Sequence, residues 1–175
     1  MYRRSKHRQK TEWLIALCGV ALLALGNGVA VAQERGDVKA AIVYNILRFV
    51  SFPGSKPTLT VCARRQDNLT EGLKGLQGRA VATRKIDVVV YDRLDQASAD
   101  CDVIYVGSAS ARSVQAPTRG QILIGEHPAF IEQGGTVGLV NFGSQVRFTI
   151  NARAARNAEV RFSSQLMQLA ARVIS

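Results

Sequence analysis

The sequence contains few of the side chains on which catalytic and metal sites are usually built. Of its 175 residues, two are His, three are Cys and one is Trp. One residue of each type lies within the first 32 residues, at His7, Trp13 and Cys18. The rest of the chain keeps a single histidine, His127, so a Ser-His-Asp or Cys-His arrangement would have to use it.

His127 lies in Gly125-Glu126-His127-Pro128, a sequence typical of a turn. Neither of the two later cysteines has a neighbouring sequence typical of a nucleophile. Structural zinc needs about four ligands at characteristic spacings, and one His with two distant Cys falls short of that number. We therefore predict that the protein is not an enzyme, with no catalytic residues and no metal site. A hydrolase that uses His127 is the alternative that this histidine leaves open.

Motifs that bind nucleotides or phosphate are also missing. The sequence has no Gly-x-Gly-x-x-Gly and no phosphate loop with Lys-Ser or Lys-Thr. Residues 107–110, Gly-Ser-Ala-Ser, follow an apolar segment and resemble a ligand-binding strand-to-helix turn, where backbone N–H groups could hold a small anion. A helix cap by Ser108 is the simpler interpretation, and we predict no cofactor.

Five aspartates occur between positions 87 and 102, which raises the question of a catalytic carboxylate pair. Most of them flank the ends of expected strands, where solvated turn carboxylates are common. We therefore predict no catalytic role for these residues, which are Asp87, Asp92, Asp95, Asp100 and Asp102.

The N-terminus has the layout of a secretory signal peptide. A basic start is followed by the apolar residues 13–25, which are too few to span a bilayer comfortably, since that takes about 20 residues. Ala30-Val31-Ala32 then offers a small-x-small cleavage site. We expect residues 1–32 to be removed and the protein to be exported to the periplasm; an uncleaved N-terminal anchor is the alternative. The basic residues are Arg3, Arg4, Lys6, Arg8 and Lys10.

Removal of the signal peptide changes the charge of the protein. The whole chain has a formal net charge of +10. Residues 1–32 contain five of the 23 basic residues and one of the 13 acidic ones, Glu12, so residues 33–175 carry 18 basic and 12 acidic residues, or +6. The excess is spread along the chain without interleaved aromatic residues, and an exported protein does not meet chromosomal DNA. We expect no nucleic-acid partner; a solvated basic surface, or weak attraction to an anionic surface or acidic partner, explains the charge.

Residues 33–175 suit one domain with one core. Apolar spacing predicts helices at 37–50, 67–78, 108–115 and 163–174. Short apolar or alternating segments predict strands at 58–63, 86–91, 103–106, 121–125, 136–140 and 145–150. Strands that are apolar throughout and alternate with helices are typical of a parallel sheet. We expect a single three-layer α/β domain whose mostly parallel sheet of about six strands is flanked by helices and ends in a C-terminal β-hairpin.

Three details of this pattern concern the ends of elements. Asp37 is expected to cap the first helix and Ser163 or Ser164 the last. The two final strands are joined by residues 141–144, where Gly143 can supply the positive φ of a hairpin turn.

Several segments, taken together, are recognisable. Residues 38–50 (VKAAIVYNILRFV) precede Phe52-Pro53, and they are followed along the chain by 60–62 (TVC), 101–106 (CDVIYV), 134–135 (GG), 146–151 (VRFTIN), 154–155 (AA) and 163–170 (SSQLMQLA). In this order and spacing, the segments resemble the YfiR family of exported bacterial proteins over nearly all of residues 33–175.

The resemblance implies a periplasmic regulatory protein that is not an enzyme. Such a protein would repress an inner-membrane diguanylate cyclase by binding its periplasmic domain. An outer-membrane-associated lipoprotein could sequester the repressor and release the cyclase, so that cyclic di-GMP rises and favours biofilm formation. Members of the family are often homodimers. The alternative is a periplasmic small-ligand sensor or carrier that uses the turn at 107–110.

Cys62 and Cys101 carry over from the family and form the candidate disulfide, since both would lie in an oxidising compartment. Some relatives have a second cysteine pair near the C-terminal hairpin, and this chain has none there. A disulfide needs Cα atoms within about 7 Å. Cys62 lies towards the end of one expected strand and Cys101 just before another. The bond therefore requires either staggered strands or a loop before Val103 that folds back.

Overall fold

The computed structural model describes residues 27–93, 100–108 and 116–175. Most of the expected signal peptide and nearly all of the helix expected at 108–115 lie outside these ranges. The chain divides into two units, residues 1–35 and 36–175, and the account below concerns the second. In the part of the chain that the structure describes, no helix is long and apolar enough to cross a membrane.

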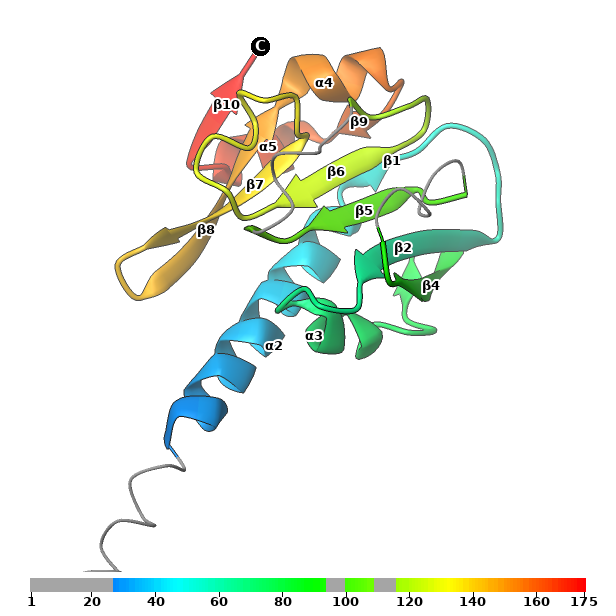
Figure 1. The fold of residues 1–175 in the computed structure, drawn as a ribbon. Coiled ribbons are helices and arrows are strands. Elements are labelled where there is room, and N and C mark those ends of the chain that lie inside the picture. Colours follow the sequence, from blue (N-terminus) through cyan, green and yellow to red (C-terminus); the bar gives the residue numbers. More distant parts are fainter. Residues whose placement is uncertain (1–26, 94–99, 109–115) are drawn as a thin grey trace, which may run out of the picture. The chain divides into compact units, whose positions relative to one another are not determined.

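Eight strands form one sheet in the order β10-β8-β7-β6-β5-β2-β4-β3 (Figure 1). The neighbouring pairs β4–β2, β2–β5, β5–β6, β6–β7 and β8–β10 are parallel, whereas β7–β8 and β3–β4 are antiparallel. The fold is therefore α/β with a mostly parallel sheet, as expected. The strands are β2 (Thr58–Arg64), β3 (Ala80–Val81), β4 (Arg84–Tyr91), β5 (Val103–Val106), β6 (Ile122–Gly125), β7 (Val137–Phe142), β8 (Gln145–Asn151) and β10 (Arg172–Ile174).

All six expected strands are present, and β3 and β10 are additional short strands at the two edges. The expected hairpin is β7–β8, where Gly143 has a φ of 60° in the turn. The last expected helix is wrong in its second half. Helix α5 (Ser164–Leu169) ends early, and β10 follows because Ala171 N donates to Phe148 O and the next residues pair with β8.

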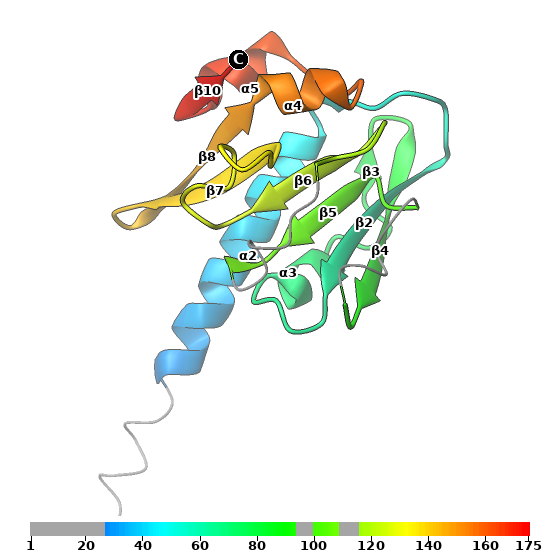
Figure 2. The same ribbon diagram turned by 45° about the horizontal axis from the view of Figure 1, so that its top comes forward.

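The remaining helices are α2 (Asn27–Leu47), α3 (Thr70–Lys74) and α4 (Ala152–Asn157). Helix α2 begins well before Asp37, so the expectation that Asp37 caps it is wrong. The cap of α5 is as expected, because the Ser163 hydroxyl accepts a hydrogen bond from Leu166 N at 3.1 Å. Figure 2 shows α4 and α5 together near β8 and β10.

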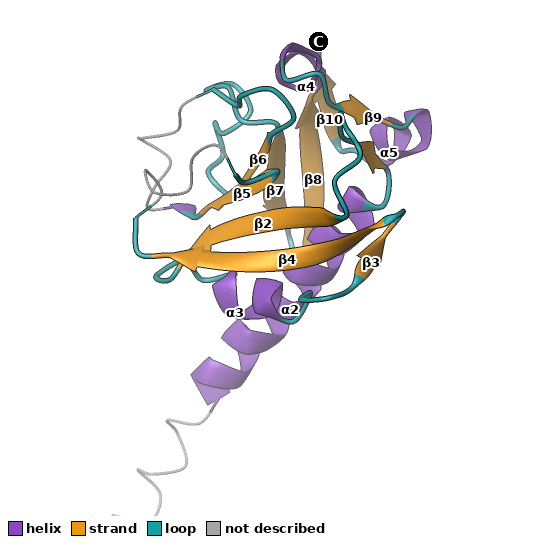
Figure 3. Cartoon of the chain, turned by 90° about the vertical axis from the view of Figure 1, so that its right-hand side faces the viewer, coloured by secondary structure: helices purple, strands orange, loops and turns teal. Residues whose placement is uncertain are grey.

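The two faces of the sheet bury different clusters. Helices α2 and α3 cover one face (Figure 3), where Val43 and Leu47 of α2 pack with Val61 and Tyr105 of the sheet. Because side chains alternate along a strand, the residues between these point to the opposite face. There a smaller cluster consists of Cys62, Cys101, Ile104, Val106, Leu123, Phe130 and Ile131. Strands β5 and β6 are buried at every position.

The strand order places a reversal beside β2. The chain passes from β2 to β4 on one side and then returns to β5 on the other side of β2. In open α/β sheets, the carboxyl ends of the strands at such a reversal are the usual place for a functional site.

A further pair of short strands, β1 (Val50–Ser51) and β9 (Arg161–Phe162), forms a small antiparallel sheet. It joins the end of α2 to the segment between α4 and α5. The buried Asn151 fixes the nearby start of α4: its Oδ1 accepts from Ala154 N at 2.9 Å, and its Nδ2 donates to Ile131 O at 2.8 Å.

Replacement of Asn151 by Ala should lower the free energy of unfolding by about 2–3 kcal/mol, because it removes a helix cap and leaves the Ile131 carbonyl with only the long 3.4 Å hydrogen bond from Gly134 N. Ser163→Ala is the matched control, since it removes only the cap of α5 and should cost about 1 kcal/mol. Urea unfolding measures both. Equal losses would show that the contact with Ile131 contributes nothing.

Candidate functional site

Polar side chains converge at the carboxyl ends of β2, β5 and β6, next to the reversal in strand order. Glu126 follows β6 directly, and Tyr105 is the third residue of the buried strand β5. Asn68 comes from the loop after β2, and Lys39 projects from α2, which covers this face of the sheet. These four residues form a cluster that we call the edge cluster.

The Glu126 carboxylate is the centre of the edge cluster. It receives hydrogen bonds from Lys39 Nζ at 2.7 Å, from Tyr105 Oη at 2.7 Å and from Asn68 Nδ2 at 3.4 Å. The side chains of Lys39 and Glu126 are only 11% and 8% exposed. A carboxylate so far from water needs a cation and several donors, and the edge cluster supplies both.

Tyr105 is a fixed donor in this cluster rather than a base. Burial and the neighbouring Glu126 carboxylate raise the pKa of the Tyr105 hydroxyl, because both disfavour the phenolate. The phenol therefore keeps its proton.

A second ion pair lies beside the edge cluster. Arg64 Nη2 is 2.8 Å from Asp67 Oδ1, and Asp67 Oδ2 accepts from Gly107 N at 3.3 Å. A Cβ added at Gly107 would lie 2.4 Å from Asp67 Oδ1, so the carboxylate occupies the space in front of this glycine. At Gly107 the protein's own Asp67 thus occupies the place that a small anion could have taken in the alternative considered for this turn. Ala109 and Ser110 of the same turn lie outside the described residues.

The other residues singled out in the sequence do not meet in one site. The His127 ring accepts a hydrogen bond from Ala129 N at 3.3 Å and so closes its own turn. Asp92 pairs with Arg65, whereas Asp87 accepts from Gln77. Asp95 lies outside the described residues.

Cys62 and Cys101 are joined in a disulfide with a Cα–Cα distance of 5.9 Å. In the register of β2 and β5, Cys62 lies opposite Ile104, three residues after Cys101. The strands alone would therefore keep the two cysteines apart, and the segment before Val103 folds back over the sheet to bring them together. Both cysteines are buried, with 0% and 3% exposure.

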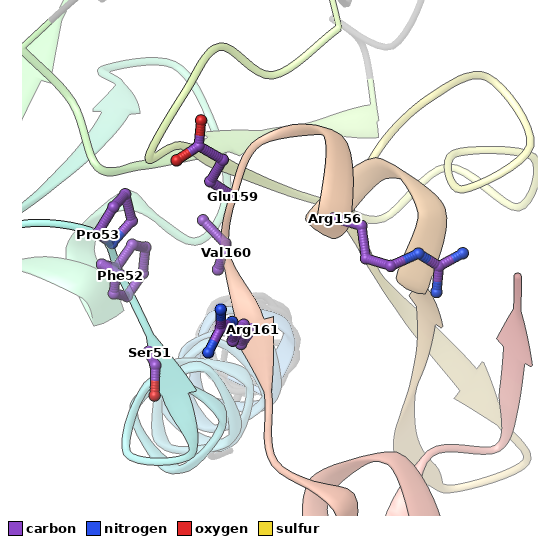
Figure 4. Close-up of a pocket in the computed structure, with 7 residues that line it drawn as sticks. All are labelled: Ser51, Phe52, Pro53, Arg156, Glu159, Val160 and Arg161. Atoms are coloured by element: carbon purple, nitrogen blue, oxygen red, sulfur yellow. The ribbon is translucent and has the colours of Figure 1, made fainter.

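A pocket of about 440 Å³ lies beside the small β1–β9 sheet. Figure 4 shows Phe52 and Pro53 on one side of it and Glu159 and Val160 on the other. Glu159 pairs with Arg119 at 2.9 Å. The lining residues are Ser51, Phe52, Pro53, Arg156, Glu159, Val160 and Arg161.

Neither the pocket nor the edge cluster was found from the sequence. The only local signal was Lys39, a charged residue on the otherwise apolar buried side of α2. Its partner Glu126 is 87 residues away in the chain. Within the described ranges, no group of three or more His, Cys, Asp and Glu residues could hold a metal ion.

Comparisons with known proteins identify a family. A family model described as YfiR/HmsC-like matches residues 36–171. The fold is similar to that of a conserved domain protein from Vibrio cholerae O1 biovar El Tor, with 13% identity and a TM-score of 0.50, over 79% of this chain and 60% of that one. It is also similar to the ABC domain in complex with L-Trp from Streptococcus pneumoniae, with 12% identity and a TM-score of 0.49, over 75% of this chain and 59% of that one.

The chain thus spans about 60% of the length of these two solved structures, and the likeness to the first shows the fold alone. No curated protein matches the sequence.

The edge cluster predicts that Glu126→Gln lowers the free energy of unfolding by about 3 kcal/mol, because the buried Lys39 ammonium loses its counter-charge. The double variant Lys39→Met/Glu126→Gln should recover part of this loss. Glu71→Gln breaks an exposed ion pair with Lys74 and should cost less than about 0.5 kcal/mol. A loss at Glu126 no larger than that at Glu71 in urea unfolding would contradict the prediction.

Proposed function

The chain belongs to the YfiR/HmsC-like family, and on that premise we propose that it represses an inner-membrane diguanylate cyclase by protein–protein contact. The family consists of periplasmic regulators of cyclic di-GMP signalling rather than of enzymes. The observation that carries the proposal is the extent of the match, residues 36–171. It covers nearly the whole chain after the expected signal peptide.

The geometry supports binding rather than catalysis. Glu126 and Asp67 at the carboxyl edge of the sheet each face a cation of the same chain, and Cys62 and Cys101 are bonded to each other. These groups therefore stabilise the fold. In contrast, a few large apolar side chains are left exposed, and apolar side chains of this kind form the buried core of protein–protein interfaces. They are Val38, Phe142, Leu169 and Val173.

The partner in this proposal is the periplasmic domain of the cyclase. A homodimer and an outer-membrane-associated lipoprotein that competes for the repressor are further parts of the proposal, and they follow from the family rather than from the geometry.

Deletion of the gene should raise cellular cyclic di-GMP, because the cyclase loses its repressor, and the full chain supplied from a plasmid should reverse the increase. The matched control is a chain that starts at Gln33 after a new Met, which has the same domain but no export signal. It should fail to complement. Cyclic di-GMP is measured by mass spectrometry of cell extracts, and an unchanged level on deletion in cells that normally make the protein would refute repression.

A second candidate function, a periplasmic small-ligand sensor or carrier, is favoured by the 440 Å³ pocket. Phe52 and Val160 give it apolar walls, and Arg161 adds a guanidinium group. Arg156 and Glu159 also line the pocket, although the Arg156 guanidinium points away from Phe52 (Figure 4). This combination suits a small organic anion with an apolar part. The pocket replaces the turn at 107–110 as the expected binding place.

A screen of amino acids and small organic acids at millimolar concentration tests this second function by thermal unfolding. A ligand that binds only the folded protein raises the Tm, by mass action. The rise should be lost in Arg161→Ala and kept in Arg147→Ala, whose guanidinium stacks on Phe142 outside the pocket. A flat screen, or equal shifts in both variants, would argue against a ligand in this pocket.

A further inference from the structure

The turn that carries Cys101 is held in place by hydrogen bonds that do not involve sulfur. Asp102 Oδ2 accepts from Thr60 N at 2.9 Å, and Asp102 N donates to Thr60 O at 3.0 Å. Gln121 Nε2 donates to Cys101 O at 3.0 Å, and Ile122 N donates to Asp102 O at 2.9 Å. Four hydrogen bonds therefore fix two consecutive residues, and we call this arrangement the Cys101 clamp.

The clamp attaches the turn to both neighbours of β5. Thr60 belongs to β2, two residues before Cys62, whereas Gln121 and Ile122 lie at the start of β6. Strand β2 thus supplies Cys62, the disulfide partner of Cys101, and also two of the four hydrogen bonds of the clamp.

Because the residues of the clamp are buried, breaking their hydrogen bonds costs free energy. The side chains of Asp102 and Gln121 belong to residues that are 6% and 5% exposed. The Asp102 carboxylate also faces Lys56 Nζ at 3.4 Å. Moving the turn away would leave a buried carboxylate and buried backbone groups without partners, which is costly.

The clamp lies at the point where the chain departs from the register between β2 and β5. By register alone, Cys101 would lie beside Leu59, three residues from Cys62. The contacts of Asp102 keep this residue at its register position beside Thr60. Gln121 holds the carbonyl of Cys101, where the chain leaves the register and the two cysteine Cα atoms come within 5.9 Å of each other.

We propose that Asp102 and Gln121 are positioning residues that hold Cys101 against Cys62 even in the reduced protein. The pair is then a structural disulfide with a strong tendency to form, because the thiols meet at a high effective concentration. Reduction breaks the S–S bond and leaves the turn in place.

Exchange with glutathione measures this tendency. In the forward direction, Cys62 and Cys101 together lose two electrons and two protons as their S–S bond forms. The S–S bond of one glutathione disulfide breaks, and the two electrons and protons give two glutathione thiols. The equilibrium constant of this exchange is the effective concentration of the two protein thiols.

The exported protein and its variants are equilibrated with glutathione from both the oxidised and the reduced side, alkylated and weighed by mass spectrometry. Asp102→Ala and Gln121→Ala should each lower the effective concentration about tenfold or more, as expected for the loss of one buried hydrogen bond. Asp102→Asn keeps an acceptor oxygen for Thr60 N and should retain most of it. Asp92→Ala, which removes an exposed carboxylate, is the control and should leave it unchanged. Losses in Asp102→Ala and Gln121→Ala no larger than in Asp92→Ala would overturn the proposal.

A second measurement does not depend on any variant folding. Amide hydrogen exchange is followed on the wild-type protein before and after reduction. The amides of Thr60, Asp102 and Ile122, which donate within the clamp, should stay protected in the reduced protein. Loss of their protection on reduction, while the rest of the sheet stays protected, would show that the disulfide holds the turn and would refute the clamp. Because this outcome does not involve a cyclase, it is independent of the proposed function.

Discussion

The complete burial of β5 is the constraint on which the rest of the structure depends. This strand lies inside the sheet, and all four of its residues are buried. Polar groups at its two ends must therefore find partners within the protein. At the carboxyl end, Tyr105 does so through Glu126, and at the amino end Asp102 does so through Thr60. The edge cluster and the Cys101 clamp thus both provide partners for polar groups at the ends of the buried strand β5.

The sequence predicted the strands better than the contacts between them. Apolar segments such as Val103–Val106 predicted their strands because a run this short and this rich in β-branched residues suits a strand that is buried on both faces. The helix expected at 163–174 failed in its second half because pairing with β8 outweighs an apolar spacing that suits a helix. The edge cluster could not be predicted, since its ion pair joins Lys39 to Glu126 across 87 positions. The spacing of residues within a short segment of sequence does not indicate which distant residue will form an ion pair with it.

The charged residues of this protein divide by exposure into two groups with different consequences. Buried ones, such as Glu126 and Asp102, are neutralised within the chain and stabilise one arrangement of the strands. Exposed arginines such as Arg156 and Arg161 give the C-terminal part an excess of positive charge beside a pocket.

The burial of the two cysteines sets an order of events in time. Thiol–disulfide exchange requires an attacking thiolate to reach a sulfur atom, and Cys62 and Cys101 are 0% and 3% exposed in the finished fold. The catalysts that oxidise or reduce thiols therefore act on this chain while it is still open, or during rare local openings. The two cysteines of this protein therefore take the oxidation state that the surroundings favour while the chain folds. They keep this state for as long as the sheet stays closed.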